Sequence, residues 1–221
     1  VTRKFFGTLF NTYSFFALYA NLDRFQYKEE NLSKETKEID LWILSRLNTL
    51  TKSVEASYND YEPTRAARLI QSFVIDELSN WYVRLCRKRF WKGEMNEDKK
   101  AAYETLFVCL QKVCILMSPI APFYSDLLYS DLSSKKDSVH LADFPLFRQE
   151  DINEDLEYKM GLAQKVSSLI LSLRKKTRIK VRQPLLRVLI PSVDSAFESA
   201  INDVKAIILS EVNIKSIEFI S

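Results

Sequence analysis

The sequence predicts a mainly α protein, in which an antiparallel helical bundle is followed by a small α/β module. Apolar residues recur at spacings of three and four through most of residues 1–148, as in amphipathic helices. After residue 178 the pattern changes to short apolar runs typical of strands. We therefore assign residues 1–148 to a helical domain and residues 149–221 to a helix followed by a mixed helix and strand module.

Size and composition are compatible with this fold. The chain has 221 residues, of which 47% are hydrophobic, so it can bury a sizeable core. No run of about 18 residues lacks charge, which predicts no transmembrane helix. The basic start followed by Phe5 and Phe6 indicates an amphipathic helix and not a signal peptide. We expect a cytoplasmic protein and, because the chain opens on Val1, a piece of a longer one.

The first two helices are predicted at residues 2–21 and from residue 40 onward. The first has a broad apolar face, which favours a place inside a bundle. Residues 26–38 are polar and aperiodic and predict a surface connection. Asp40 is expected to be the N-cap of the second helix. The core side of that helix holds Ile43, Leu47, Leu50 and Val54.

A long helix is predicted from Pro63 to about Trp91. Proline suits the first turn of a helix, and Gly93 is a typical residue after its end. Val74, Leu78, Trp81 and Leu85 form its apolar seam, and we expect Trp81 and Tyr82 to belong to the core.

A polar face lies beside this seam. At about 100° per residue, Asn80, Arg84, Arg87 and Trp91 fall on one side of the helix, with Lys88 on its border. Guanidinium groups that pair with phosphate, next to an indole that can stack on a base, suit the binding of single-stranded or loop RNA. The alternative is a solvated basic face whose last Trp packs on the bundle.

The rest of the bundle follows the same pattern. A further helical seam contains Tyr103, Phe107, Leu110, Cys114 and Met117 and ends at Ser118-Pro119, and a short helix follows to about Leu132. Residues 131–145 predict a polar loop that contains the single histidine, His140. One histidine without a cluster of other ligands is a poor metal or acid–base candidate.

No catalytic or metal site is expected in this chain. Cys86, Cys109 and Cys114 form no C-x-x-C pair and are predicted to be reduced packing residues. Three glycines leave no glycine-rich phosphate loop or dinucleotide fingerprint, and there is no nucleophile elbow and no zinc-ligand spacing.

The C-terminal module begins with a helix that has acidic residues at its start and basic residues at its end, as the helix dipole favours. Strands are predicted at residues 178–182, 185–190 and 212–220, with a helix containing Phe197, Ile201, Val204 and Ile208 before the last one.

A second basic cluster surrounds the end of that first helix. It could neutralise RNA phosphates, or it could combine a helix C-terminus with the wet face of an exposed strand. Its members are Arg174, Lys175, Lys176, Arg178, Lys180 and Arg182.

Four stretches resemble the anticodon-binding region of isoleucyl-tRNA synthetases. They are Asp-Glu-Leu-Ser-Asn-Trp-Tyr-Val-Arg with Arg-Lys-Arg-Phe-Trp at 76–91, the helix at 9–22, Asp-Leu-Trp-Ile-Leu-Ser-Arg-Leu at 40–47, and Ile-Lys-Val-Arg-Gln-Pro-Leu at 179–185. The resemblance covers nearly the whole chain. Valyl, leucyl and methionyl enzymes share the helical domain, and the same domain from a valyl or leucyl enzyme is an alternative.

The resemblance implies a part in translation. The full-length enzyme would activate isoleucine with ATP and esterify it to tRNA(Ile), with ATP and magnesium as cofactors and zinc as a further candidate. This fragment lacks the family's catalytic motifs, so it should be inactive and hold no cofactor. Its expected partners are tRNA(Ile) and the catalytic and editing domains of the same chain. We expect a monomer without membrane contact.

The resemblance and the polar face together select the RNA-binding candidates. They are Asn11, Arg84, Arg87, Lys88, Arg89 and Trp91, with the second basic cluster as a secondary set. A net charge of +3 is too small to indicate RNA binding by itself. The competing hypothesis is a helical protein-interaction scaffold that docks an acidic partner, because Arg and Trp are also favoured interface anchors.

Overall fold

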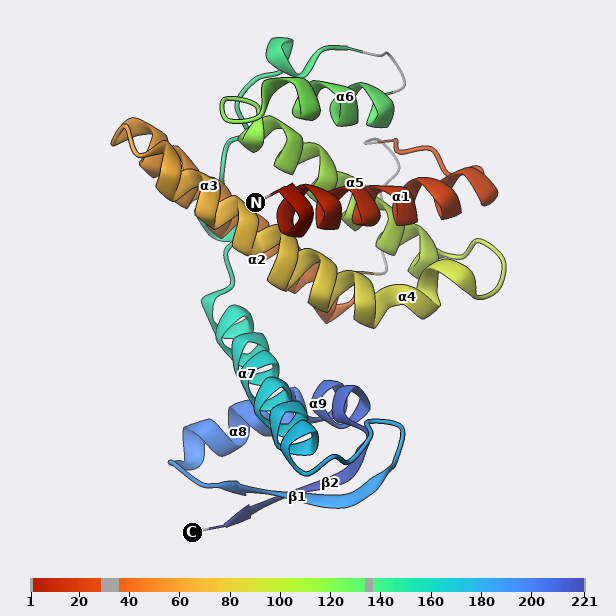
Figure 1. The fold of residues 1–221 in the computed structure, drawn as a ribbon, viewed down its shortest axis with the longest axis vertical. Coiled ribbons are helices and arrows are strands. Elements are labelled where there is room, and N and C mark those ends of the chain that lie inside the picture. The colour runs from red at the N-terminus through yellow and green to blue at the C-terminus, as the bar shows by residue number, and fades with distance from the viewer. Residues whose placement is uncertain (1, 29–35, 134–136, 221) are drawn as a thin grey trace. The chain divides into compact units, whose positions relative to one another are not determined.

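The computed structural model describes residues 2–28, 36–133 and 137–220 and forms two compact units (Figure 1). The first unit runs to Ile152 and the second begins at Asn153, whereas the sequence pattern placed the boundary between residues 148 and 149. The difference comes from the short turn η5 (Gln149–Asp151), which packs on the helical unit. There Lys52 Nζ donates a hydrogen bond to Gln149 Oε1 at 2.9 Å.

The first unit is helical, and the mainly α prediction is confirmed. Five longer helices, α1, α2, η3, α5 and α6, contact one another through their apolar faces, while the shorter elements complete the ends. The elements are η1 (Thr2–Phe6), α1 (Gly7–Leu22), α2 (Glu38–Asn59), α3 (Pro63–Ser72), η3 (Phe73–Val83), α4 (Arg84–Trp91), α5 (Glu97–Met117), α6 (Pro122–Leu132) and η4 (Val139–Leu141).

The predicted long helix is continuous from Pro63 to Trp91, as the α3, η3 and α4 ribbons show (Figure 1). Pro63 occupies its first turn, and Gly93 follows its end with a φ of 69°, a conformation that glycine adopts without steric cost. The η3 segment has the wider π-helical hydrogen bonding. Both α1 and α2 pack on η3, and Trp81, Tyr82 and Val83 are all buried in succession.

The core of this unit lies around α5. The seam predicted on this helix is confirmed, since Tyr103, Phe107, Leu110, Cys114 and Met117 are all buried. Edge-to-face and stacked aromatic pairs surround it, among them Phe25 on Tyr103 at a centroid distance of 4.9 Å.

The start of α2 differs from the prediction. The helix begins at Glu38, so Asp40 is not its N-cap. Asp40 lies in the first turn, where its Oδ2 accepts a hydrogen bond from the backbone N–H of Lys37 at 3.1 Å. The predicted connection at 26–38 lies partly outside the described residues, and so does the loop at 131–145.

The second unit is a small α/β module, as predicted. Helix α7 (Glu154–Lys176) is capped by Asn153, and the parallel strands β1 (Leu185–Pro191) and β2 (Ile214–Ile220) pair with Leu185 opposite Ile214. Helices α7, α8 (Ser195–Asp203) and α9 (Lys205–Val212) lie on one side of this sheet (Figure 1). Buried residues from the sheet and helices form its core.

Two predictions for this module were wrong. Residues 178–182 form turns and not a strand, because side chains from α7 and from the end of α9 take up their carbonyls. The single helix expected around Phe197 to Ile208 is two helices, since the backbone at Val204 leaves the helical region with φ −100° and ψ 9°.

Several other expectations concern what the chain contains. Cys86, Cys109 and Cys114 are free and buried, as predicted. Within residues 2–28, 36–133 and 137–220, no helix is long and apolar enough to cross a membrane. The same residues contain no group of three or more His, Cys, Asp or Glu side chains arranged for a metal ion.

Candidate nucleic-acid interface

Helix α4 displays a cationic and aromatic strip on its solvent side. Arg84, Arg87, Lys88 and Trp91 occur at helical spacings of three and four, and all four are exposed. We call these four residues the α4 strip. The opposite side of the helix is buried through Cys86 and Phe90. Packing therefore fixes which side of α4 faces solvent.

The two ends of the strip have different local support. Arg84 donates from Nε to the carbonyl of Asn80 at 2.7 Å, and its guanidinium lies 5.7 Å from the centre of the Trp81 ring. Trp91 is 52% exposed at the other end, so its indole offers a free ring surface. The strip thus combines charge with a group that can stack on a base.

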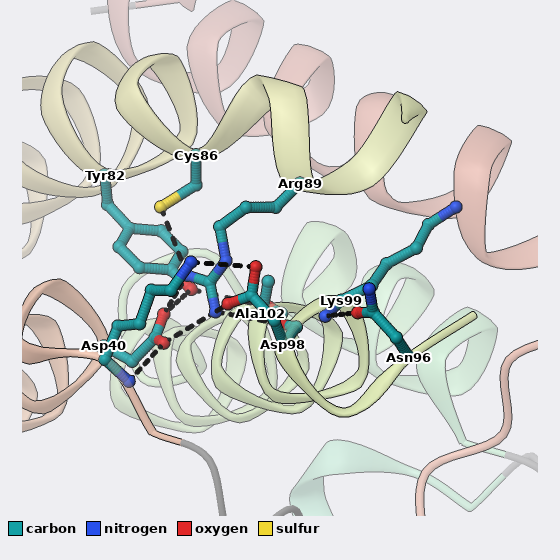
Figure 2. A network of polar contacts seen from close by, with 9 residues as sticks. Asp40, Tyr82, Cys86, Arg89, Asn96, Asp98, Lys99 and Ala102 are labelled. Atoms are coloured by element: carbon teal, nitrogen blue, oxygen red, sulfur yellow. Dashed lines mark hydrogen bonds and ion pairs between the residues drawn. The ribbon is translucent and has the colours of Figure 1, made fainter. Parts of the chain in front are cut away.

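Arg89, the fifth candidate on this helix, points into the protein (Figure 2). Its guanidinium pairs with both carboxylate oxygens of Asp40, at 2.7 and 2.8 Å, and it donates to the carbonyl of Asp98 at 2.9 Å. Asp40 is fully buried. These contacts favour a structural role for Arg89, because a guanidinium that left Asp40 for a phosphate would leave a buried carboxylate unpaired.

The network around Arg89 joins three helices. Tyr82 donates its hydroxyl to Asp40 at 2.7 Å, and Arg89 also approaches the carboxylate of Asp98 at 2.8 Å. Burial lowers the pKa of Arg89, but the hydrogen bonds and charge of Asp40 outweigh it and raise that pKa above its ordinary value. Burial and the Asp40 charge raise the pKa of Tyr82, so its hydroxyl stays protonated and donates.

A second ion pair, between the buried Lys99 and the partly exposed Asp23, lies at the turn between α4 and α5. Lys99 is an ion-pair partner of Asp23 and donates to the carbonyl of Gly93 at 3.3 Å. Tyr103 donates to Asp23 Oδ2 at 2.6 Å. Burial raises the pKa of Asp23, but the hydrogen bonds from Lys99 and Tyr103 outweigh it and lower it below the ordinary value. Lys99 therefore links the turn after the α4 strip to Asp23 on the protein side.

Asn11, the candidate outside this helix, is exposed on α1. The buried residues of that helix, Leu9, Thr12 and Phe16, face the bundle. Asn11 lies one helical turn before Phe15, whose ring contacts that of Phe90 on α4 at a centroid distance of 5.2 Å.

The second basic cluster also contains one buried arginine and several exposed cations. Arg174 is only 3% exposed, and it donates to the carbonyls of Lys180, Gln183 and Asn213 at 3.0 to 3.2 Å. It is therefore an internal residue. The other five members are exposed, namely Lys175, Lys176, Arg178, Lys180 and Arg182.

A comparison with protein families identifies the fold. Residues 40–190 match the family described as the anticodon-binding domain of tRNA ligases. The chain belongs to this family. The matched range includes the α4 strip and the second basic cluster, and it shows that the predicted anticodon-binding region was assigned to the correct family.

Relatives of this anticodon-binding domain are named isoleucine–tRNA ligases. The proteins of Bacteroides thetaiotaomicron and Porphyromonas gingivalis are 56% and 54% identical to the whole chain, which spans 19% of each. The protein of Dehalococcoides mccartyi is 42% identical over 98% of the chain, which spans 22% of that protein. The chain thus spans about a fifth of the length of these relatives.

The sequence pattern of this anticodon-binding domain located the exposed strip, but we grouped Arg89 with it because Arg87, Lys88 and Arg89 are adjacent cations. At about 100° per residue, Arg89 falls about 140° from Arg84, on the side of the buried Cys86, so helical phase already separates it from the strip. A usable signal was Asp40, an acidic residue at a seam position of α2 that requires a buried cation.

Proposed function

We propose that the helical unit binds the anticodon stem and loop of tRNA(Ile) through the α4 strip. One observation carries the proposal: three exposed cations and one exposed indole share a face of α4, inside the residues that match an anticodon-binding family. The names of the relatives support isoleucine as the amino acid and tRNA(Ile) as the RNA.

Each residue of the strip has a chemical role in this proposal. Arg87 and Lys88 neutralise phosphates, an interaction that releases counterions. Arg84 is oriented by Asn80 and adds an exposed guanidinium charge to the strip. Trp91 offers a stacking surface for an unpaired base of the loop. Asn11 is a further candidate for a hydrogen bond to RNA.

The parent protein is proposed to be an isoleucine–tRNA ligase. It would activate isoleucine with ATP and magnesium and transfer it to tRNA(Ile), using parts outside this chain, zinc being a further candidate cofactor there. The same proposal places it in the cytoplasm as a monomer, with the catalytic and editing domains as partners of this region.

Binding of tRNA across a salt series tests the proposal. The chain is titrated with tRNA(Ile) and with a noncognate tRNA, and the expected result is preference for tRNA(Ile) and a steep log-linear loss of affinity with salt. Each lost phosphate contact should reduce the steepness of the plot of log K against log salt by about 0.7 to 0.9. The double variant Arg87→Ala/Lys88→Ala should therefore reduce that steepness by about 1.5.

A matched control removes two cations elsewhere in the same unit. Arg65 and Arg68 are exposed on α3, so Arg65→Ala/Arg68→Ala makes the same change in net charge. Equal losses of tRNA affinity in the two double variants would show that only net charge matters and would refute RNA binding by the α4 strip. A weak salt response with preference for an acidic peptide would favour the protein-interaction scaffold.

A further inference from the structure

The loop that follows α7 is strongly cationic. Residues 175–183, which are the last two residues of α7 and the loop after it, are here called the 175–183 loop. They hold five exposed cations, and the sequence has no Asp or Glu between Glu157 and Asp194. The loop turns tightly, with Arg178 at a φ of 58° and the N–H of Gln183 donating to the carbonyl of Lys180 at 3.0 Å. Its positive charge therefore has no neighbouring carboxylate along the chain.

The carbonyls of this loop are taken up from the protein side. The buried guanidinium of Arg174 donates to the carbonyls of Lys180 and Gln183 at 3.2 and 3.0 Å. The side-chain amide of Asn213 donates to the carbonyls of Val181 and Arg182 at 2.9 and 3.2 Å. Four consecutive carbonyls are thus bound by two side chains.

The N–H groups of Val181 and Arg182 in this loop consequently face outward. A trans peptide sets its N–H opposite to its C=O, and the described chain has no cis peptide bond. The N–H groups of Val181 and Arg182 belong to peptides whose carbonyls are bound by Arg174 and Asn213. Within the part of the chain that the structure describes, neither N–H has a hydrogen-bond acceptor.

We propose that the 175–183 loop is a second RNA contact, in which the N–H groups of Val181 and Arg182 and the flanking cations bind backbone phosphates. Outward peptide N–H groups beside cations make an anion-binding concavity. Arg174 and Asn213 act as positioning residues that hold the amides in place. The choice of RNA as the polyanion rests on the proposed function, whereas the anion site does not.

The composition of the loop favours phosphate over base recognition. Residues 175–183 contain no aromatic side chain, so the loop lacks a surface on which a base could stack. Backbone N–H groups with Arg and Lys are the usual donors to phosphate oxygens, and such contacts position RNA without reading its sequence. The loop should therefore add affinity equally for cognate and noncognate tRNA.

The first experiment tests the anion site with inorganic phosphate. Backbone amide resonances of the full chain are followed by NMR as phosphate is added, and the largest shifts are expected at Val181 and Arg182. Asn213→Gly keeps the left-handed backbone at this position, where φ is 51°, and deletes two hydrogen bonds without changing charge. The Asn213→Gly variant should abolish the phosphate-induced shifts at Val181 and Arg182, while its far-UV circular dichroism stays unchanged.

The second experiment tests the RNA assignment. Lys180→Ala/Arg182→Ala should weaken tRNA binding about tenfold near 0.1 M salt and lower the salt slope by about 1.5. The control Lys165→Ala/Lys215→Ala removes two exposed cations from the same unit and should change affinity less than about twofold. Cognate and noncognate tRNA should lose the same factor.

The outcomes separate this inference from the proposed function. Absence of phosphate-induced shifts at Val181 and Arg182 would overturn the anion site, whatever the α4 strip does. Phosphate-induced shifts, combined with equal tRNA affinity of the loop variant and its control, would overturn the RNA assignment and favour an acidic protein surface. RNA binding by the α4 strip is tested separately, by the tRNA affinity of Arg87→Ala/Lys88→Ala.

Discussion

At the scale of single residues, burial separates cations that hold the fold from cations that can meet RNA. Arg89 and Arg174 each bind protein oxygens through a buried guanidinium, whereas Arg87 and Lys88 are exposed. All four lie in basic stretches of the sequence, so their charge alone does not distinguish them. The residues that each cation contacts distinguish them.

Trp91 offers a direct test of stacking. Trp91→Ala should lower tRNA affinity by about 1 to 3 kcal/mol, the range for one base stacked on an aromatic ring. Trp91→Phe should recover part of this loss because it retains a ring face. Fluorescence anisotropy with labelled tRNA gives both affinities, and the result contradicting a stacking role is equal affinity of Trp91→Ala and the unmodified chain.

Asp23 gives a prediction for pH. Its pKa is lowered in the folded state, so its contribution is fully present above the unfolded value of about 4 and is lost as pH falls through the folded value. Asp23→Asn should therefore be less stable at pH 7 and lose less stability on acidification below about pH 4. Urea unfolding at a series of pH values measures this.

The control for that experiment is Asp60→Asn, which removes an exposed carboxylate at the end of α2. It corrects for the change in net charge. Parallel stability curves for Asp23→Asn and the unmodified chain would show that the contacts of Asp23 with Lys99 and Tyr103 do not stabilise the fold.

At the scale of elements, α4 has one buried face and one exposed, cationic face. Phe90 is fully buried against Phe15 and Tyr103, so Phe90→Ala should cost about 3 to 5 kcal/mol of unfolding free energy. Arg87→Ala should change stability by less than about 0.5 kcal/mol and weaken tRNA binding by about 1 kcal/mol. Denaturant unfolding and anisotropy measure the two quantities. The reverse pattern would mean that the faces of α4 are exchanged.

The elements themselves were largely predictable from hydrophobic spacing. The helix from Pro63 to Trp91 and the seam of α5 depend on local periodicity, which the sequence displays directly. The turns at residues 178–182 were not predictable in this way. Their alternating pattern resembles a strand, and only contacts with Arg174 and Asn213, distant in sequence, remove their carbonyls from strand pairing.

The candidate site was predictable in part for a related reason. Helical phase placed Arg84, Arg87, Lys88 and Trp91 on one side of the helix, and they are exposed there. Helical phase places Arg89 toward the buried side of α4, but its ion-pair partner Asp40 lies 49 residues earlier. Long-range ion pairs of this kind have no local periodic signal.

At the scale of the whole molecule, each unit has its own core, and cysteine reactivity reports on the helical one. Burial raises the pKa of Cys86 and Cys114 to about 12, and that of Cys109 above its ordinary value. We expect no alkylation of the native chain by iodoacetamide at pH 8 except through opening of the core. Mass spectrometry over time measures the rate, and labelling as fast as in the urea-unfolded chain would contradict a closed core.

The network around Arg89 also bears on which substitutions this anticodon-binding domain can accept. Arg89 binds both oxygens of Asp40 and the carbonyl of Asp98 at once, which the single nitrogen of lysine cannot reproduce. In the proposed function, Arg87 and Lys88 contact phosphates at the surface, which requires only charge and reach, so we expect Arg and Lys to replace one another at these two positions. Position 89 should therefore be intolerant of an exchange that its two neighbours accept, and a scan judged only by RNA affinity would mistake it for the strongest RNA contact.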